Sequence, residues 1–310
     1  MATISSAFLQ RALTLRHLRL LVALDELQQV GRVAASLHIS QPAVSKALAE
    51  IESGVGVPLF ERTPKGMVPT VHGTCLVRYA HMMTNEIGRA VDELTGLEQG
   101  MDATVAVGAT SGAGTGYLLN AAILQGHRRM KHLAVTVTEG TRELLLRQLR
   151  TGKLDLVVGA VGDAAAMDDL DSTPLYIDSL VIVCGKRHPL ATKARLGVAD
   201  VVGQSWVLPP RTARVRAALE ALFRPHAARP RVLVESLSLD LVLELVANGT
   251  ALAVLPQHLA RRLAMAGQVR ALDIETPGLV MPVSVFSRTG LAASAAVETF
   301  KACVVEAAAR

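Results

Sequence analysis

Aromatic side chains are scarce in this sequence: only 3% of its 310 residues are aromatic, namely one Trp, three Tyr and five Phe. Proteins that bind single-stranded nucleic acid stack bases on exposed rings, so this shortage argues against that class. The chain is nevertheless basic, with 32 Lys and Arg against 27 Asp and Glu and a net charge of +5. Duplex DNA, anionic metabolites and a membrane surface therefore stay open as partners.

Cysteine is also rare, and the three cysteines lie far apart without any CxxC spacing: Cys75, Cys184 and Cys303. A disulfide framework or a structural zinc site is not expected, and a reducing cytoplasm is the compartment that fits. Long apolar runs are missing as well. Carboxylates interrupt the most apolar later segment, residues 237–255, and the N-terminus lacks the unbroken apolar core of a secretory signal. We expect a cytoplasmic protein with no membrane partner and no metal site.

Apolar residues, in contrast, make up 50% of the chain and charged residues only 19%, which is enough to bury a core. A length of 310 residues indicates about two compact units. The sequence patterns of these two units differ.

The first unit begins with three helices at short intervals. Leucines at helical spacing predict a helix over residues 14–28, and a short second helix follows around residues 33–37. A tight connection leads to a third helix, for which Ser40 is a good N-cap and Pro42 an acceptable first-turn residue. This spacing predicts a helix-turn-helix, whose second helix enters the major groove of DNA.

The third helix has a polar side that suits base recognition. Gln41, Ser45 and Lys46 fall opposite its apolar face; a Gln amide bonds adenine, and Ser and Lys reach phosphate or guanine. A two-stranded wing is expected over residues 57–70, with Arg62 and Lys65 at its tip for phosphates or a minor groove. On the helix pattern alone, the alternative is an ordinary three-helix subdomain with a solvated polar face.

Linked motifs in this region resemble the N-terminal signature of LysR-type transcriptional regulators: Ala34-Ala35, the stretch 40–45, Leu59-Phe60-Glu61-Arg62 and Thr70-x-x-Gly73. The resemblance implies a winged helix-turn-helix DNA-binding domain over residues 14–69. Val30-Gly31-Arg32 departs from the family pattern, because Ser or Thr often caps that helix. The expected contacts with double-stranded promoter DNA are Ser40, Gln41, Pro42, Ser45, Lys46, Arg62 and Lys65.

A long helix is expected next, and its apolar residues repeat in heptads that allow two copies to pair side by side. The alternative is a single helix lying on its own domain. In the family that the sequence resembles, this helix is a dimerisation linker, here residues 70–98. The resemblance therefore implies a homodimer or homotetramer, with contacts at Leu76, Ala80, Met83, Ile87, Ala90 and Leu94.

The remainder of the chain alternates strands and helices. Strands are expected at residues 104–108, 133–138 and 154–159, with helices between them. This rhythm predicts an α/β fold with a parallel sheet. Three further stretches, 152–159, 188–190 and 246–256, resemble the LysR effector domain.

That resemblance implies a two-lobe, periplasmic-binding-protein-like (type 2) domain over residues 102–310. Lobe I would comprise residues 102–173 and 276–310, and lobe II residues 174–275. Within the family, the sequence is most similar to the branch that controls aromatic-acid and sugar-related catabolism.

An effector site is expected where strands end and helices begin, because ligands of α/β sheets bind outside the C-terminal strand ends. The candidate contacts with a small anionic molecule are Thr110, Ser111, Gly112, Thr141 and Arg211. The alternative is that the two threonines are plain helix caps and Arg211 is solvated.

The glycine-rich region around residues 108–117 does not match the sequence motifs of enzymes. A dinucleotide-binding G-x-G-x-x-G would need glycine where Tyr117 stands, and G-x-S-x-G fails at Ala109. No catalytic residue is predicted, and no cofactor beyond a small-molecule co-inducer.

Two function classes follow from these patterns. The favoured one is a DNA-binding regulator whose C-terminal domain senses a small anionic metabolite and changes oligomer geometry on DNA. The alternative is a cytoplasmic enzyme or small-molecule-binding protein that uses its N-terminal helices only for dimerisation.

The surplus positive charge does not itself favour DNA, because residues 1–98 hold nine basic and nine acidic side chains. The whole surplus lies in residues 99–310, and segment 211–231 holds six arginines against a single acid, Glu220. We interpret this surplus as a feature of an anionic effector site or of a surface for an acidic partner, with a solvated helix as the alternative.

Overall fold

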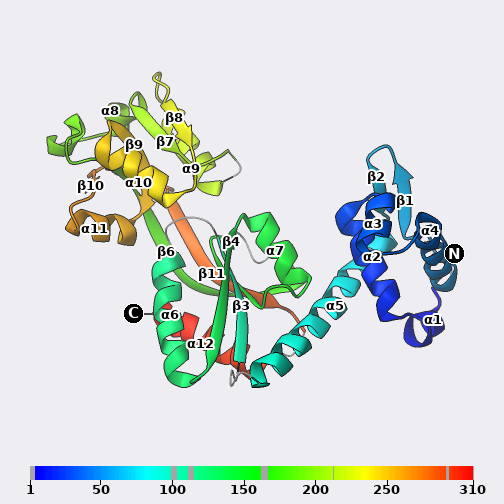
Figure 1. Cartoon of the computed structure of the whole chain (residues 1–310). Coiled ribbons are helices and arrows are strands. Elements are labelled where there is room, and N and C mark those ends of the chain that lie inside the picture. The colour runs from blue at the N-terminus through cyan, green and yellow to red at the C-terminus, as the bar shows by residue number, and fades with distance from the viewer. Residues whose placement is uncertain are drawn as a thin grey trace. The chain divides into compact units, whose positions relative to one another are not determined.

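The computed structural model describes residues 4–98, 103–110, 115–161, 167–211, 213–290 and 293–309. The chain divides into two compact units, each shown with its elements labelled in Figure 1. Unit 1 comprises residues 1–103 together with the short segment 147–154. Unit 2 comprises residues 104–146 and 155–310.

Unit 1 is a bundle of helices with a two-stranded hairpin. Its elements are α1 (Ser6–Arg11), α2 (Leu15–Leu27), α3 (Val30–Ser36), α4 (Gln41–Val55), β1 (Phe60–Thr63), β2 (Gly66–Pro69) and α5 (Val71–Glu98). Its core is built from fully buried side chains of the three consecutive helices α2, α3 and α4: Leu21, Leu24, Val33, Val44 and Ile51. The expected helix-turn-helix with its wing is confirmed.

The helix ends in this bundle follow the local sequence signals. Ser40 Oγ accepts a hydrogen bond from the Ala43 amide at 3.3 Å, so α4 begins where expected. Gly56, with φ of 91°, ends it. The start of α3 at Gln29 has no side-chain cap, as the Val30-Gly31-Arg32 stretch predicted.

The wing is fastened to α4 through one carboxylate. Glu52 Oε1 accepts hydrogen bonds from the amides of Leu59 at 2.7 Å and Phe60 at 3.1 Å. These two amides stand at the base of β1, which pairs antiparallel with β2 from Phe60↔Pro69 to Thr63↔Gly66. Glu52 therefore fixes the hairpin relative to the helix that precedes it.

Unit 2 is built around a nine-stranded sheet, counted over the described residues, in the order β4-β3-β5-β11-β6-β9-β7-β8, with β10 beside β6. The strands are β3 (Ala103–Thr110), β4 (Leu133–Gly140), β5 (Leu156–Gly159), β6 (Leu170–Cys184), β7 (Ser205–Leu208), β8 (Arg231–Glu235), β9 (Ala251–Pro256), β10 (Arg270–Ala271) and β11 (Val280–Arg288). β3 pairs parallel with β5, and β7 pairs parallel with both β8 and β9. The predicted α/β class is confirmed, but the expectation of a parallel sheet is wrong in part. The sheet is mixed, because β11 pairs antiparallel with β5 and β6, and β6 pairs antiparallel with β9.

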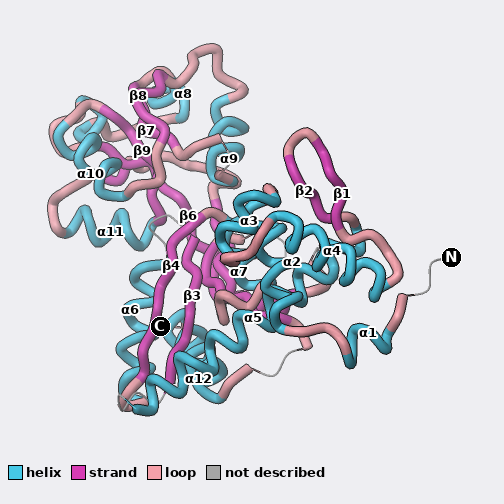
Figure 2. The backbone as a smooth tube through the Cα atoms, turned by 45° about the vertical axis from the view of Figure 1, so that its right-hand side comes forward, coloured by secondary structure: helices cyan, strands magenta, loops and turns pink. Residues whose placement is uncertain are grey.

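Unit 2 also contains helices, which Figure 2 draws in cyan beside the magenta strands of the sheet. Those described are α6 (Thr115–Arg129), α7 (Arg142–Arg150), α8 (Val198–Val202), α9 (Arg214–Phe223), α10 (Leu239–Asn248), α11 (Gln257–Met265) and α12 (Ala295–Ala308), with the 3₁₀ turn η2 (Pro189–Thr192). No helix within the described ranges is long and apolar enough to cross a membrane.

Two long strands join the halves of the sheet. β6 pairs with β11 from Leu170 to Ser179 and then with β9 from Leu180 to Cys184. The strand over residues 170–179 was not predicted from the sequence, so the long crossover is a finding of the structure. The expected lobe boundaries at 173/174 and 275/276 stay predictions.

A buried histidine holds part of the second half of the sheet. His188 is 4% exposed; its Nδ1 accepts from the Leu190 amide at 3.1 Å, and its Nε2 donates to the Thr250 carbonyl at 3.0 Å. Acceptance at Nδ1 requires the neutral ring, whereas an Nε2–H bond to Thr250 is available to both protonation states; burial lowers the pKa of His188.

Because the native state binds this proton less readily than the unfolded chain, His188 contributes stability above its ordinary pKa near 6.5 that is lost as the pH falls. We expect His188→Asn, which keeps an acceptor for Leu190, to show a shallower loss of stability between pH 7.5 and 5. The difference in slope is at most about 1.4 kcal/mol per pH unit. Urea unfolding across this range measures it; identical slopes would contradict the neutral, buried ring.

Candidate nucleic-acid interface and effector site

The polar side of α4 faces solvent along its first two turns. Ser40, Gln41, Pro42, Ser45 and Lys46 are all exposed. The opposite side of the same helix is closed, with side chains that are between 0% and 8% exposed: Val44, Leu48 and Ile51. The helix is therefore held by one face and presents amide, hydroxyl and ammonium groups on the other, which are the groups that read base edges.

A glycine on the preceding helix makes room for Gln41. A Cβ atom at Gly31 would lie 3.2 Å from Gln41 Nε2, so the amide packs closely over this bare backbone. Gly31 therefore leaves the space that the Gln41 amide occupies.

The wing carries its two cations in the exposed positions that the sequence predicted. Arg62 and Lys65 are exposed, and Thr63 Oγ1 accepts from the Lys65 amide at 3.2 Å and donates to the Gly66 carbonyl at 3.0 Å. At its other side the hairpin rests on the end of α2, because the Met67 amide donates to the Gln28 carbonyl at 2.6 Å. The hairpin projects from the helices in Figure 2.

The expected dimer contacts on α5 fall into two groups in the structure. Ala80 is fully buried and Leu76 packs against the core of unit 1. Met83, Ile87 and Leu94 are 48%, 42% and 65% exposed, and Ala90 is exposed as well.

The division has a local cause, because α5 packs on α2 over its first turns. His81 Nε2 lies 3.2 Å from Asp25 Oδ2 on α2, and this pair stands just beyond the buried Ala80. Further along, Asn85 donates to the Thr151 carbonyl at 2.7 Å, within the same unit. The later part of the heptad pattern is therefore the part that stays exposed in the single chain.

In unit 2 the predicted effector residues lie at strand ends. Thr110 ends β3, and its Oγ1 would lie 2.0 Å from a Cβ atom at Gly159, which ends β5 with φ of 147°. Glycine at 159 therefore lets β5 approach the Thr110 hydroxyl. Ser111 and Gly112 lie outside the described residues.

The other two effector candidates in the described part of the chain are Thr141 and Arg211. Thr141 precedes α7, and its Oγ1 accepts from the Leu144 amide at 3.4 Å, which is the capping role considered as the alternative. Arg211 is exposed after β7.

A neighbouring arginine of the basic run is structural. Arg216, only 3% exposed, donates to the Pro209 carbonyl at 2.8 Å and to carboxylates of Glu220 and Glu235 at 2.8 and 2.9 Å. It fixes the ends of β7 and β8 around the segment that carries Arg211.

One polar cluster in this unit was not predicted from the sequence. His258, at the start of α11, has Nδ1 2.5 Å from Oδ2 of Asp178, a carboxylate of β6 that is 7% exposed. The Tyr117 ring at the start of α6 lies 6.4 Å from the His258 ring. Burial and the charge of Asp178 raise the pKa of Tyr176 to about 12. No sequence signal could have joined residues 80 positions apart.

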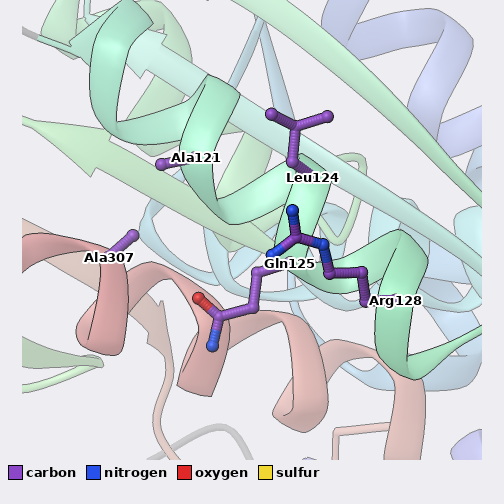
Figure 3. Close-up of a pocket in the computed structure, with 5 residues that line it drawn as sticks. All are labelled: Ala121, Leu124, Gln125, Arg128 and Ala307. Atoms are coloured by element: carbon purple, nitrogen blue, oxygen red, sulfur yellow. The ribbon is translucent and has the colours of Figure 1, made fainter.

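A small cavity of about 160 Å³ lies elsewhere, between α6 and α12. Figure 3 shows its lining residues, Ala121, Leu124, Gln125, Arg128 and Ala307. None of the predicted effector residues lines it. Beside it, Arg129 of α6 pairs with Glu306 of α12 at 2.6 Å, so this region joins two helices.

The cysteines offer no activated thiol in the interior. Burial raises the pKa of Cys184 to about 11, and burial also raises the pKa of Cys303. Cys75 is exposed on α5. Among the described residues, no three His, Cys, Asp or Glu side chains are grouped as a metal site.

A winged helix-turn-helix with an exposed reading helix, joined through a long helix to an α/β ligand-binding domain, defines a class: one-component DNA-binding regulators. The comparison with known families specifies it further. Residues 15–74 match the family described as "Bacterial regulatory helix-turn-helix protein, lysR family", and residues 98–309 match "LysR substrate binding domain". The chain belongs to the LysR family of transcriptional regulators.

Individual relatives agree with this assignment. The HTH-type transcriptional regulator GbpR of Azospirillum brasilense is 34% identical over 281 residues, which cover 90% of this chain and 82% of the relative. The regulator GalR of Pseudomonas putida is 30% identical, over 93% of this chain and 72% of its own length. These relatives favour the regulator interpretation over an enzyme or a solute-binding module.

Solved structures support the fold over nearly the whole chain. A full-length OxyR from Pseudomonas aeruginosa has a TM-score of 0.62 and 27% identity, covering 94% of this chain and 97% of that one. The LysR family regulator CbnR has a TM-score of 0.61 at 19% identity, covering 96% of this chain and 99% of that one. The protein is thus a LysR-type DNA-binding transcriptional regulator with an effector-binding domain.

Proposed function

We propose that this regulator reads its operator through Gln41, Ser45 and Lys46, with Arg62 and Lys65 of the wing on phosphates or in a minor groove. One observation carries this proposal: the first turns of α4 expose polar groups while the opposite face is fully closed. Ser40 and Pro42 set the start of the helix that holds these groups. The protein acts in the cytoplasm, without catalysis of its own.

Self-association is part of the proposal. The exposed later half of the α5 heptads, Met83, Ile87, Ala90 and Leu94, gives an apolar seam for a second copy. The sheet of unit 2 ends in edge strands β4 and β8, which carry half-exposed Val137, Val232 and Leu233. Two heads on two half-sites bind far more tightly than one, and a homotetramer extends the same advantage.

The signal in this proposal is a small anionic metabolite held by Thr110, Thr141 and Arg211, together with Ser111 and Gly112. Support comes from hydroxyls at two strand ends, the glycine at 159 that permits close approach, and the positive surplus of residues 99–310. The two interior thiols, Cys184 and Cys303, do not suit a redox signal, because burial raises their pKa values and thiolates are the forms that react readily with oxidants.

Ligand binding would act by shifting a population. An effector that contacts both halves of the sheet in unit 2 favours one arrangement of the strands β6 and β11 that join them. A change in oligomer geometry on DNA follows if that arrangement is coupled to the seam on α5.

The effector proposal is tested by thermal unfolding of the full chain against a panel of small carboxylates and phosphates. A specific anion at 100 times its Kd stabilises the native state by about 2.7 kcal/mol. We expect Arg211→Ala to reduce this stabilisation, and Arg224→Ala, an exposed arginine of the same basic run, to leave it unchanged. A panel without any stabilising anion, or equal losses in both variants, would contradict an anion site at Arg211.

A further inference from the structure

A short helix ahead of the DNA-binding domain packs on the reading helix at the end remote from its reading residues. Helix α1 is capped by Ser5, whose Oγ accepts from the Phe8 amide at 3.4 Å. The Ser5 amide donates to the Val55 carbonyl, the last residue of α4, at 3.1 Å. The chain ahead of α2 is thus attached to the C-terminal end of α4.

Helices α1 and α4 are in contact where the Phe8 ring packs against Gly54. A Cβ atom at Gly54 would lie 2.3 Å from the Phe8 ring, so the ring occupies the space where a side chain would stand. Glycine within a helix costs about 1 kcal/mol relative to alanine. Gly54 lies inside α4, and because it has no side chain the Phe8 ring can pack against the helix backbone there.

The same ring also touches the start of α2. Phe8 stacks on His17, with ring centroids 6.4 Å apart and planes inclined by 19°. His17 and Thr14 cap one another across the first turn of α2, through two hydrogen bonds of 3.3 Å. Phe8 therefore stands between the beginning of α2 and the end of α4 and packs against the core of unit 1.

Because α4 is a single helix, a change at its C-terminal end displaces the residues at its N-terminal end. The 15 residues of α4 form one helix with Gln41, Ser45 and Lys46 at its start and Gly54 near its end. At 1.5 Å per residue this helix is about 20 Å long, so a tilt of about 5° displaces the far end by nearly 2 Å. Base recognition depends on distances of that size, whereas flexible Lys and Arg side chains follow phosphates over larger shifts.

We propose that α1 is a positioning element for DNA recognition, in which Phe8, packed on Gly54, sets the direction of α4. Helix α1 contacts the end of α4 that does not read bases, so it acts through that helix. Helix α1 contributes to the preference for one DNA sequence over another. It does not contribute to the general electrostatic attraction between the protein and duplex DNA.

The test uses the full chain and a duplex enriched by the parent protein from a random library, with unselected duplex for comparison. For Phe8→Ala and for Gly54→Ala we expect affinity for the enriched duplex to fall roughly tenfold, and affinity for unselected duplex to stay within about twofold. The salt dependence of binding stays that of the parent, because the phosphate contacts are kept.

The two positions should also be coupled. Phe8→Ala combined with Gly54→Ala is expected to lose no more than Phe8→Ala alone, because the new methyl group then meets no ring. Gln10→Ala, on the exposed side of α1, and Gly88→Ala, a helical glycine with no atom within 4 Å of an added Cβ, serve as controls that keep the parent's preference.

Three results would overturn the proposal: parent-like preference in Gly54→Ala, multiplied losses in the double variant, or equal losses on enriched and unselected duplex. The last result is what a purely structural role predicts, since partial unfolding removes active protein for every duplex alike. Circular dichroism of each variant measures that folded fraction independently.

Discussion

Replacement of Gly73 by alanine is expected to lower the free energy of unfolding of unit 1 by about 1–3 kcal/mol, the usual cost of forcing extra atoms into a packed site. A Cβ atom at this position would lie 1.8 Å from the Leu59 carbonyl oxygen, and a backbone atom has no rotamer with which to give way. The first turn of α5 is also fixed there, because the Gly73 amide donates to Thr70 Oγ1 at 3.0 Å. The new methyl group must therefore separate α5 from the base of the wing.

Gly88 of the same helix is the matched control. It is exposed, and an added Cβ would meet no atom within 4 Å. Gly88→Ala is thus expected to stabilise α5, by up to about 1 kcal/mol, through helix propensity alone. Hydrogen exchange of the α4 and α5 amides measures both variants within unit 1. Equal effects of the two substitutions would contradict the close approach of α5 to Leu59.

Loss of the Gln41 amide is expected to relax base preference. Gln41→Ala should cost about 1–3 kcal/mol on the enriched duplex, the value of one bidentate contact with a base edge, and leave affinity for unselected duplex unchanged. The side chain is exposed at the first position of α4 and lies over Gly31, so its removal leaves no cavity in the core. Titration of both duplexes at fixed salt measures the two affinities.

Lys46→Ala on the same face provides the contrasting variant. If Lys46 binds a phosphate, its removal weakens binding to every duplex and lowers the slope of log K against log salt by about 1. A uniform loss for Gln41→Ala, of the kind expected for Lys46→Ala, would contradict a reading role for the amide.

Local signals made the DNA-binding unit predictable. The start of α4 depends on Ser40 and Pro42, and both act within a single turn of the chain. The hairpin likewise depends on the short turn between Thr63 and Gly66. Helix α1 was not predicted, because six residues carry a weak periodic signal and its packing depends on a glycine far along the chain.

The heptads of α5 show the limit of periodicity. A repeat of seven identifies an apolar stripe but does not say which molecule covers it. Here Leu76 and Ala80 pack within unit 1, while Met83 and Leu94 remain exposed on the same stripe. Intrachain and interchain packing therefore share one sequence pattern, and only the structure divides them.

Long-range pairing explains what was missed in unit 2. Residues 170–179 of β6 have mixed burial and include Pro174, so they show no clean alternation; pairing with β11 more than a hundred residues later makes them a strand. The pair Asp178–His258 depends on that same strand. The basic run was visible in the sequence. The ion pairs of Arg216 with Glu220 and Glu235 were not predicted from it.

If the exposed face of α4 reads bases, the chain must distinguish one duplex sequence from another. The most direct test is equilibrium binding of the full chain, at physiological salt, to the duplex it enriches from a random library and to unselected duplex of equal length. We expect binding to the enriched duplex to be tighter by a factor of about 10³ or more. Equal affinity for the two duplexes would contradict it.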